Sequence, residues 1–347
     1  AVLLYEDGSV DTLPSDSTVE KSLQKIIQAA NNGYYLHALD KHKGLLTSTE
    51  VTSTSTSTST ARSTGNLEFS TQEVGQLQFS PQERVVSIHY PNPDEIVQTP
   101  VTILGDDSLL LKYLNPHLAV VVTELTDEAR KEYEQENDTE NGFVSLLSKN
   151  TDTMTVQTTE QNTNDNSQKQ KRKPMGATKP GEDIPPTTEP SIPTLFINVI
   201  DTVSAKLLYR ISHTNVAPLG DTAKIPVSIS ENWILYSYPN HKTRRSDVVA
   251  LTLHEGMIDK HGITAFSRLD QETTFSSFTS PKPIVLHKVY TIGKTVTALG
   301  VTQTARGITQ KNFVLGLGGS GMIVTVDRRM LDPRRPTGEP KATEKLE

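Results

Sequence analysis

Residues 226–256 constrain the fold most, because they contain three apolar, strand-like runs separated by two polar turns. The runs span residues 227–229, 233–238 and 248–253. Short apolar runs bounded by turn residues are typical of strands that pack on both faces. The stretch therefore predicts an antiparallel meander, and the turn-like composition of His254, Glu255 and Gly256 predicts that the meander ends there.

Similar runs recur along the rest of the chain and predict further short strands. These lie at residues 2–5, 10–13, 34–39, 45–46, 74–79, 85–90, 101–104, 109–113, 118–123, 195–200, 206–211, 284–290, 296–301, 313–317 and 322–326. A single short helix is expected, because Val19, Leu23, Ile26 and Ile27 follow helical spacing after capping residues at 15–17. Many short strands with little helix leave a sandwich, a barrel or a propeller.

Two stretches of low complexity interrupt these runs. Residues 51–65 are dominated by Ser and Thr and are expected to form a loop, because they offer no apolar face to bury. Residues 126–193 hold few apolar residues and are expected to be a disordered loop inserted into a sheet unit. The remaining sequence suffices for about six four-stranded blades, divided between residues 1–125 and 194–336, with a flexible tail at 337–347.

Two segments echo each other in a way that favours the propeller. Residues 38–48 (ALDKHKGLLTS) and 198–212 (NVIDTVSAKLLYRIS) both run from a strand through an aspartate, Asp40 or Asp201, into a turn and a second strand. This order resembles the turn of quinoprotein-type propeller blades. The fold class we predict is therefore all-β, a β-propeller with quinoprotein-like or WD-like blades.

Composition and charge exclude several classes of function. The formal net charge is −7 and the pI is near 5.8, which opposes binding to nucleic acid. The one basic cluster, at residues 169–173, contains no aromatic residue that could stack on bases. The chain has no cysteine, so thiolate zinc sites, redox chemistry at CxxC and a cysteine nucleophile are excluded. No apolar run reaches the roughly 18–20 residues of a membrane span.

The motifs that suggest chemistry are better explained as turns. Residues 316–321 match GxGxxG, but the β-forming run at 322–326 follows where a dinucleotide site needs a helix. His254 and Glu255 begin an HExxH motif, yet Ile258 replaces its second histidine. No serine lies in a GxSxG elbow. We therefore predict no catalytic, cofactor-binding or metal-binding residue.

Three segments resemble, in order, subunit 1 of the endoplasmic reticulum (ER) membrane protein complex; they lie at residues 104–124, 230–256 and 304–336. The most specific matches are KYLNP (112–116) and LDPRRP (331–336). The resemblance implies lumenal β-propellers followed by a membrane helix that lies outside this chain, so that the sequence is expected to be a piece of a longer protein. It also implies a non-enzymatic scaffold in a complex that inserts and folds tail-anchored and multipass clients.

Under this resemblance, the partners are other subunits of the complex and transmembrane clients, with no cofactor. Asn137, in the only N-x-Ser/Thr triplet, is the expected glycosylation site, in an exposed loop. Candidate contacts to partner subunits are Arg244, Arg245, Arg334 and Arg335, with ordinary solvated surface as the alternative. Two other functions stay open, a quinone-dependent dehydrogenase-like enzyme and a sorting or adhesion module on the same fold.

Overall fold

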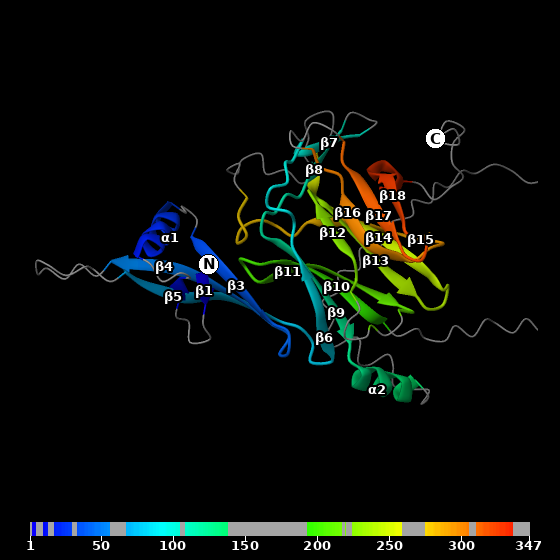
Figure 1. Cartoon of the computed structure of the whole chain (residues 1–347), viewed down its shortest axis with the longest axis horizontal. Coiled ribbons are helices and arrows are strands. Elements are labelled where there is room, and N and C mark those ends of the chain that lie inside the picture. The colour runs from blue at the N-terminus through cyan, green and yellow to red at the C-terminus, as the bar shows by residue number, and fades with distance from the viewer. Residues whose placement is uncertain are drawn as a thin grey trace, which may run out of the picture. The chain divides into compact units, whose positions relative to one another are not determined.

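The structure of the chain is a computed structural model. The residues that it describes are 2–4, 10–12, 17–29, 33–55, 67–104, 108–137, 193–216, 219, 224–258, 275–304 and 310–335. Two compact units emerge, one formed by residues 1–130 and 193–347 and the other by residues 131–192. Every strand belongs to the first unit (Figure 1). The predicted strand positions are confirmed, and the meander of 226–256 is antiparallel as expected.

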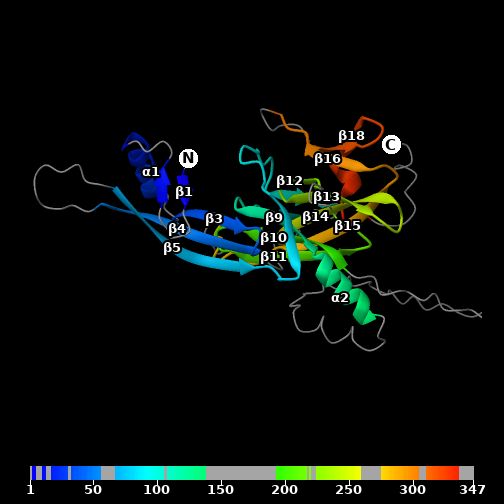
Figure 2. The same cartoon turned by 60° about the horizontal axis from the view of Figure 1, so that its bottom comes forward.

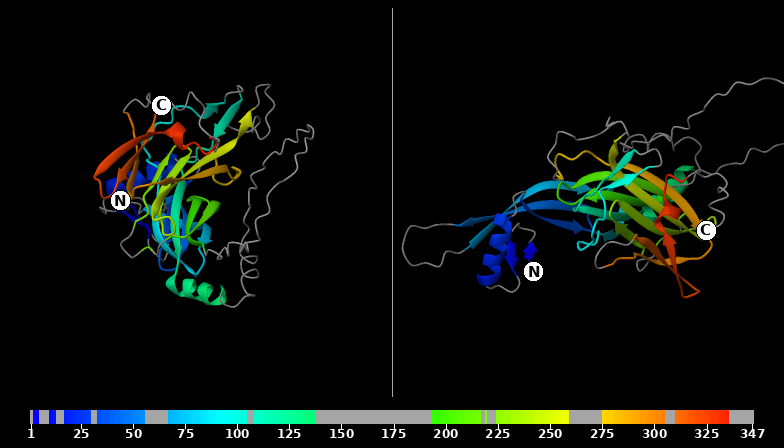
Figure 3. Two further views of the ribbon diagram at one scale, coloured as in Figure 1. Left: turned by 90° about the vertical axis from the view of Figure 1, so that its right-hand side faces the viewer. Right: turned by 90° about the horizontal axis from the view of Figure 1, so that it is seen from above.

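The first sheet is antiparallel and contains β3 (Tyr34–Asp40), β4 (Leu45–Ser55) and β5 (Leu67–Gln78). The expected helix is α1 (Ser17–Ala29), which lies beside β4 (Figure 3). Its Leu23 is buried. The hairpin expected at the N-terminus is also present as β1 (Val2–Leu4) paired with β2 (Val10–Thr12).

The loop predicted for residues 51–65 is wrong at its start, because residues 51–55 belong to β4 and pair with β5. Thr52 Oγ1 lies 2.7 Å from Ser70 Oγ across the two strands. Threonine is β-branched and fits a pleated strand, so backbone pairing with β5 outweighs the lack of an apolar face. Residues 56–66 lie outside the described part of the chain.

The second sheet has four strands in the order β11–β10–β9–β6. Their bounds are β6 (Glu83–His89), β9 (Leu118–Leu125), β10 (Pro193–Asp201) and β11 (Lys206–Thr214). All eight residues of β9 are buried, and β9 is hydrogen-bonded on both edges (Figure 2). It is therefore the central strand of the best-covered sheet.

The third sheet joins the meander to two distant segments. Its strands are β12 (Val227–Ser230), β13 (Trp233–Asn240), β14 (Arg245–Ile258) and β15 (Ile284–Ile292), with β7 (Val101–Ile103) and β8 (Leu109–Lys112) at the end of β14. The turn predicted at residues 254–256 is wrong: β14 continues through it, because β8 pairs with residues 254–258. Local composition carries no sign of this partner from another part of the chain.

The fourth sheet contains β16 (Val296–Val301), β17 (Asn312–Leu317) and β18 (Met322–Asp327), followed by the 3-10 helix η1 (Arg328–Leu331). The glycine-rich motif at 316–321 spans the end of β17 and the turn before β18, so the predicted hairpin is confirmed. Gly319 and Gly321 have φ values of +76° and +63° there, a conformation that glycine adopts without steric strain.

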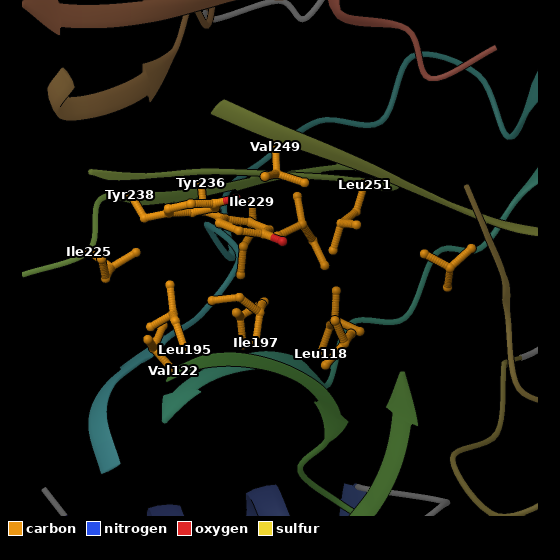
Figure 4. Packing of buried hydrophobic residues seen from close by; sticks show 14 of the residues in the cluster. Leu118, Val122, Leu195, Ile197, Ile225, Ile229, Tyr236, Tyr238, Val249 and Leu251 are labelled. Atoms are coloured by element: carbon orange, nitrogen blue, oxygen red, sulfur yellow. The ribbon is translucent and has the colours of Figure 1, made fainter. Parts of the chain in front are cut away.

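Three apolar cores lie between successive sheets, because alternate residues of a strand point to opposite faces. Between the first and second sheets lie Leu46, Phe79 and Val121. Val122 and Ile197 of the second sheet face Tyr236 and Leu251 of the third, as Figure 4 shows. The opposite face of the third sheet packs on the fourth through Trp233, Leu235, Val248, Phe313 and Leu315. Each inner sheet is thus buried on both faces.

The strand count per sheet departs from the expected six four-stranded blades. Among the described residues, the sheets contain two, four, six, three and three strands. No helix in the described ranges is long and apolar enough to cross a membrane.

One helix was not predicted: α2 (Asp127–Asn137) lies in the segment 126–193 that was expected to be disordered. The Thr126 hydroxyl accepts a hydrogen bond from Ala129 N at 3.3 Å, and Asp127 and Glu128 lie in the first turn, where negative charge favours a helix. The polar composition concealed this start signal. Residues 138–192, including the basic cluster, lie outside the described ranges.

Candidate functional site

Three hairpin turns share one hydrogen-bonding device, a side-chain oxygen at the end of a strand that accepts two backbone N–H groups. Asp40 Oδ1 accepts from residues 42 and 43 at 2.9 and 3.0 Å. Asp201 Oδ1 accepts from residues 203 and 204 at 2.9 and 2.8 Å. Asn240 Oδ1 accepts from residues 242 and 243 at 3.0 and 3.1 Å. The two predicted copies are thus joined by a third, which sequence comparison missed because asparagine replaces aspartate.

The last residue of each turn has a left-handed backbone. Gly44, Ala205 and Arg244 have φ values of +62°, +50° and +54°. Only glycine adopts this conformation without a steric penalty, which for other residues is about 1–2 kcal/mol. The backbone conformation of Arg244 therefore carries a steric penalty that glycine at this position would avoid.

The four predicted arginines fall into two groups. Arg244 and Arg245 are exposed at the turn between β13 and β14. Arg334 instead directs its guanidinium to Asp332 of its own segment, with Nε 3.0 Å from Oδ1 and Nη2 2.6 Å from Oδ2. The carbonyl of Arg335 accepts a hydrogen bond from Lys288 Nζ at 2.5 Å. The fork of Arg334 is thus already engaged within the chain, whereas Arg244 and Arg245 face solvent.

The predicted glycosylation site lies at a helix end. Asn137 is the last residue of α2, where an exposed loop was expected, and the next two residues of its triplet are outside the described ranges.

A buried ion network links the third and fourth sheets. The Glu231 carboxylate lies 2.7 Å from Lys112 Nζ, 2.9 Å from Lys311 Nζ and 3.3 Å from Arg328 Nη1. Glu95 Oε1 is 2.7 Å from the same Lys311 Nζ, and Glu95 Oε2 accepts a hydrogen bond from the Glu231 backbone N–H at 3.0 Å. Five charged side chains from separate segments therefore meet at the β12–β13 turn.

This environment shifts the ionisation of Glu231. Burial favours the neutral acid, but the hydrogen bonds from Lys112 and Lys311 outweigh it and lower the pKa of the Glu231 carboxyl to about 2. The Arg328 guanidinium also lies 5.2 Å from the Trp233 ring centre, in a cation–π geometry. No local sequence pattern predicts this network, because its members are up to 233 positions apart in the chain, from Glu95 to Arg328.

A second network lies within the second sheet. The Glu124 carboxylate is 2.8 Å from Arg84 Nη2 and 3.3 Å from Arg130 Nη2, and it accepts a hydrogen bond from Leu219 N at 2.7 Å. Arg210 Nη2 lies 2.6 Å from Glu83 Oε1. The Glu124 pairs hold the end of β9 to β6 and to the first turn of α2, and the Arg210–Glu83 pair joins β11 to β6.

Two histidines, His213 and His254, are buried within the sheets. His213 Nε2 lies 2.6 Å from Tyr236 Oη, and His213 Nδ1 lies 3.1 Å from Tyr238 Oη. Burial lowers the pKa of His213 to about 4, so the ring is neutral at physiological pH. His254, in β14, likewise has its pKa lowered by burial to about 4. Among the described residues, no three His, Asp or Glu side chains gather so as to hold a metal ion.

Small antiparallel sheets that stack face to face, with three of their hairpins closed by a similar turn, place this chain among the β-propeller proteins. A family profile described as ER membrane protein complex subunit 1, second β-propeller, matches residues 1–175 and 176–347. The chain therefore belongs to the ER membrane protein complex subunit 1 family.

Individual relatives agree with this assignment. The chain is 27% identical over 338 residues to ER membrane protein complex subunit 1 of Xenopus laevis and 26% identical over 338 residues to that of Gallus gallus, in each case over 96% of this chain and 25% of the relative. The protein of the same name from Schizosaccharomyces pombe is 30% identical over 150 residues, which are 42% of this chain and 16% of that protein. The chain thus spans about a quarter of the length of the two vertebrate relatives.

Proposed function

We propose that this chain is a non-enzymatic, lumenal scaffold region of the ER membrane protein complex, which supports the insertion and folding of tail-anchored and multipass clients. The observation that carries the proposal is its membership of the subunit 1 family over its whole length. The fold suits the role, since sheets buried on both faces form a stiff frame whose turns can contact several partners. Attachment to the membrane would come from a helix outside these residues.

Co-purification tests the proposed function. The full-length protein is tagged, isolated from its native membrane in mild detergent, and its companions are identified by mass spectrometry. We expect the other subunits of the complex in near-stoichiometric amounts. A tagged protein that is folded and membrane-associated but brings down no other subunit contradicts the proposal. Absorbance and metal analysis of the same preparation test the dehydrogenase alternative, which requires a bound redox group.

The partner-binding residues that we propose are Arg244 and Arg245. They are exposed, whereas the guanidinium of Arg334 is engaged by Asp332 and the backbone of Arg335 is held by Lys288. Exposed guanidinium groups present a rigid fork of donors that matches a carboxylate.

Lumenal orientation gives a separate prediction at Asn137, whose triplet fits the acceptor sequence for an N-linked glycan. The native protein should lose mass on treatment with an N-glycosidase, and Asn137→Gln should abolish this change. Asn141→Gln is the control, because this nearby asparagine lies outside any acceptor triplet. An unmodified Asn137 in native protein would contradict the site.

A further inference from the structure

Residues 241–245, which are the turn between β13 and β14 together with the first residue of β14, concentrate positive charge in a chain of net charge −7. All five residues, His241, Lys242, Thr243, Arg244 and Arg245, are exposed. Within the described part of the chain, no ion pair involves Lys242, Arg244 or Arg245. This cationic turn therefore carries three exposed cations that pair with none of the acidic side chains described by the structure.

The equivalent turns of the same chain show what is unusual about it. The β3–β4 turn is also basic, but it begins with Asp40, which lies 3.6 Å from Lys43 Nζ. The β10–β11 turn contains no charged residue between Asp201 and Lys206, and Ser48 Oγ donates a hydrogen bond to its Val203 carbonyl at 2.6 Å. In the cationic turn, Asn240 provides the same backbone hydrogen bonds without a carboxylate. Its positive charge is thus not neutralised locally.

The acid nearest in sequence is also unavailable. Asp247 is buried, and its two carboxylate oxygens accept hydrogen bonds from Asn240 Nδ2 at 2.7 Å and from Thr291 Oγ1 at 2.8 Å. It therefore anchors the base of the hairpin and does not pair with the arginines at its tip.

Arg244 supplies an independent observation. Its left-handed conformation, with a φ of +54°, is shared by Gly44, which avoids the steric penalty, and by Ala205, which is buried in an apolar core. A residue held in an unfavourable backbone conformation points to a role for its side chain. Since Arg244 is exposed, packing within the chain does not explain its presence.

We propose that the cationic turn docks a carboxylate-rich surface of a partner protein, with Arg244 and Arg245 as the residues that determine specificity. This rests on the proposed function, since it describes how the scaffold recognises one of its partners. A protein surface is favoured over a membrane because the turn presents no exposed aromatic or aliphatic side chain to enter a lipid interface. Two neighbouring guanidinium groups instead suit forked hydrogen bonds to carboxylates.

The contact is located by a photo-reactive amino acid placed at Lys242 in the full-length protein within the native membrane. We expect crosslinks to a peptide of another subunit that contains several Asp or Glu residues. Crosslinks only to lipid, crosslinks only within the protein itself, or no crosslink would each overturn the proposal. In parallel, binding of residues 1–347 to phosphatidylserine-containing vesicles through this turn would assign it to the membrane and would also overturn it.

Matched variants then separate recognition from folding. Arg244→Gly removes the side chain and relieves the backbone, so it should keep or raise the unfolding midpoint while it weakens association with the crosslinked subunit by about tenfold or more. Arg244→Lys keeps the charge but loses the forked guanidinium, so it should weaken association with the crosslinked subunit less than Arg244→Gly does. Arg244→Glu reverses the charge and should also weaken association. Its control is Lys294→Glu, at an exposed turn between β15 and β16, which makes the same change in charge and should leave association unchanged.

The outcomes distinguish the two proposals. If the wild-type protein assembles with the other subunits and both Arg244→Gly and Arg244→Glu retain wild-type affinity, the inference about the turn is wrong and the scaffold function stands. If Lys294→Glu weakens association as much as Arg244→Glu, the effect is general electrostatics and the inference is also wrong. If the wild-type protein assembles with no other subunit, the proposed function itself fails.

Discussion

The same side-chain device at Asp40, Asp201 and Asn240 acts in very different surroundings. Asp40 lies in an exposed turn, whereas Asp201 is only 1% exposed and also accepts a hydrogen bond from Asn115 Nδ2 at 2.8 Å. Removal of a buried acceptor leaves its donors unsatisfied, and this is the larger part of the energetic loss. Burial, more than the motif itself, therefore decides how much each copy contributes to stability.

We accordingly expect Asp201→Ala to reduce the free energy of unfolding by about 3 kcal/mol and Asp40→Ala to reduce it by much less. In the first variant, two backbone N–H groups and the Asn115 amide lose their acceptor inside the protein; in the second, water replaces it. Urea denaturation monitored by Trp233 fluorescence measures both. Equal losses in the two variants would show that the turn geometry alone sets the contribution.

His213 yields a prediction about pH. Because burial lowers its folded-state pKa to about 4, below the usual value near 6.5, the unfolded chain binds this proton first. The stability contributed by the neutral ring is complete above pH 6.5 and is lost as the pH falls from 6.5 towards 4. An NMR titration of the His213 ring should show a midpoint well below 5. A midpoint near 6.5 would mean that the ring is not enclosed by Tyr236 and Tyr238.

At the scale of elements, segments that are distant in sequence are joined by packing and also by charge. Glu231, at the β12–β13 turn, binds Lys112 from β8 together with Lys311 and Arg328 from the two ends of the β17–β18 hairpin. An isolated buried charge is strongly unfavourable, so each member of the network depends on the others. The network therefore makes the third and fourth sheets interdependent.

Glu231→Gln should reduce the free energy of unfolding by about 3 kcal/mol, because it leaves the buried ammonium and guanidinium groups with less compensating charge. The matched control is Asp327→Asn, which breaks an exposed pair with Arg329 and should change stability by less than about 1 kcal/mol. Since the Glu231 pKa is lowered to about 2, its contribution is present above pH 4.5 and is lost as the pH falls towards 2. Thermal unfolding at pH 7 and pH 3 measures both effects.

At the scale of the whole molecule, the order of the cores predicts where the structure opens first. β9 is buried along its whole length and paired on both edges, whereas β18 pairs with β17 alone in the described part of the chain and its Ile323 is 77% exposed. Opening of a terminal sheet exposes one apolar core, but opening of β9 exposes two.

Hydrogen exchange should therefore be slowest in β9 and β10 and markedly faster in β18. Glu231→Gln should accelerate exchange in β16–β18 more than in β9, because the network that it weakens joins the third and fourth sheets. Mass spectrometry of exchanged peptides resolves these segments. Uniform exchange across all four sheets would indicate one cooperative unit and contradict this order.

The sequence predicted those features that depend on neighbouring residues. Apolar runs such as residues 118–123 and 233–238 located the strands, and the glycines at 318–321 identified a hairpin turn despite their likeness to a dinucleotide motif. The prediction failed where a partner came from elsewhere: residues 51–55 became a strand through β5, and residues 254–258 did so through β8. The start of α2 was an exception, because its capping signal was local and was overlooked.

The candidate site likewise combines features that the sequence predicts with features that only the tertiary structure decides. Sequence alone determined the all-β character, the position of nearly every strand, the family and the basic character of residues 241–245, since backbone preference and charge reside in the residues themselves. Only the tertiary structure decided that Asp332 engages Arg334 while Arg244 is exposed, that Asp247 is buried, and that Glu231 contacts three cations. Those outcomes depend on contacts between residues far apart in the chain, whose energies no local pattern contains.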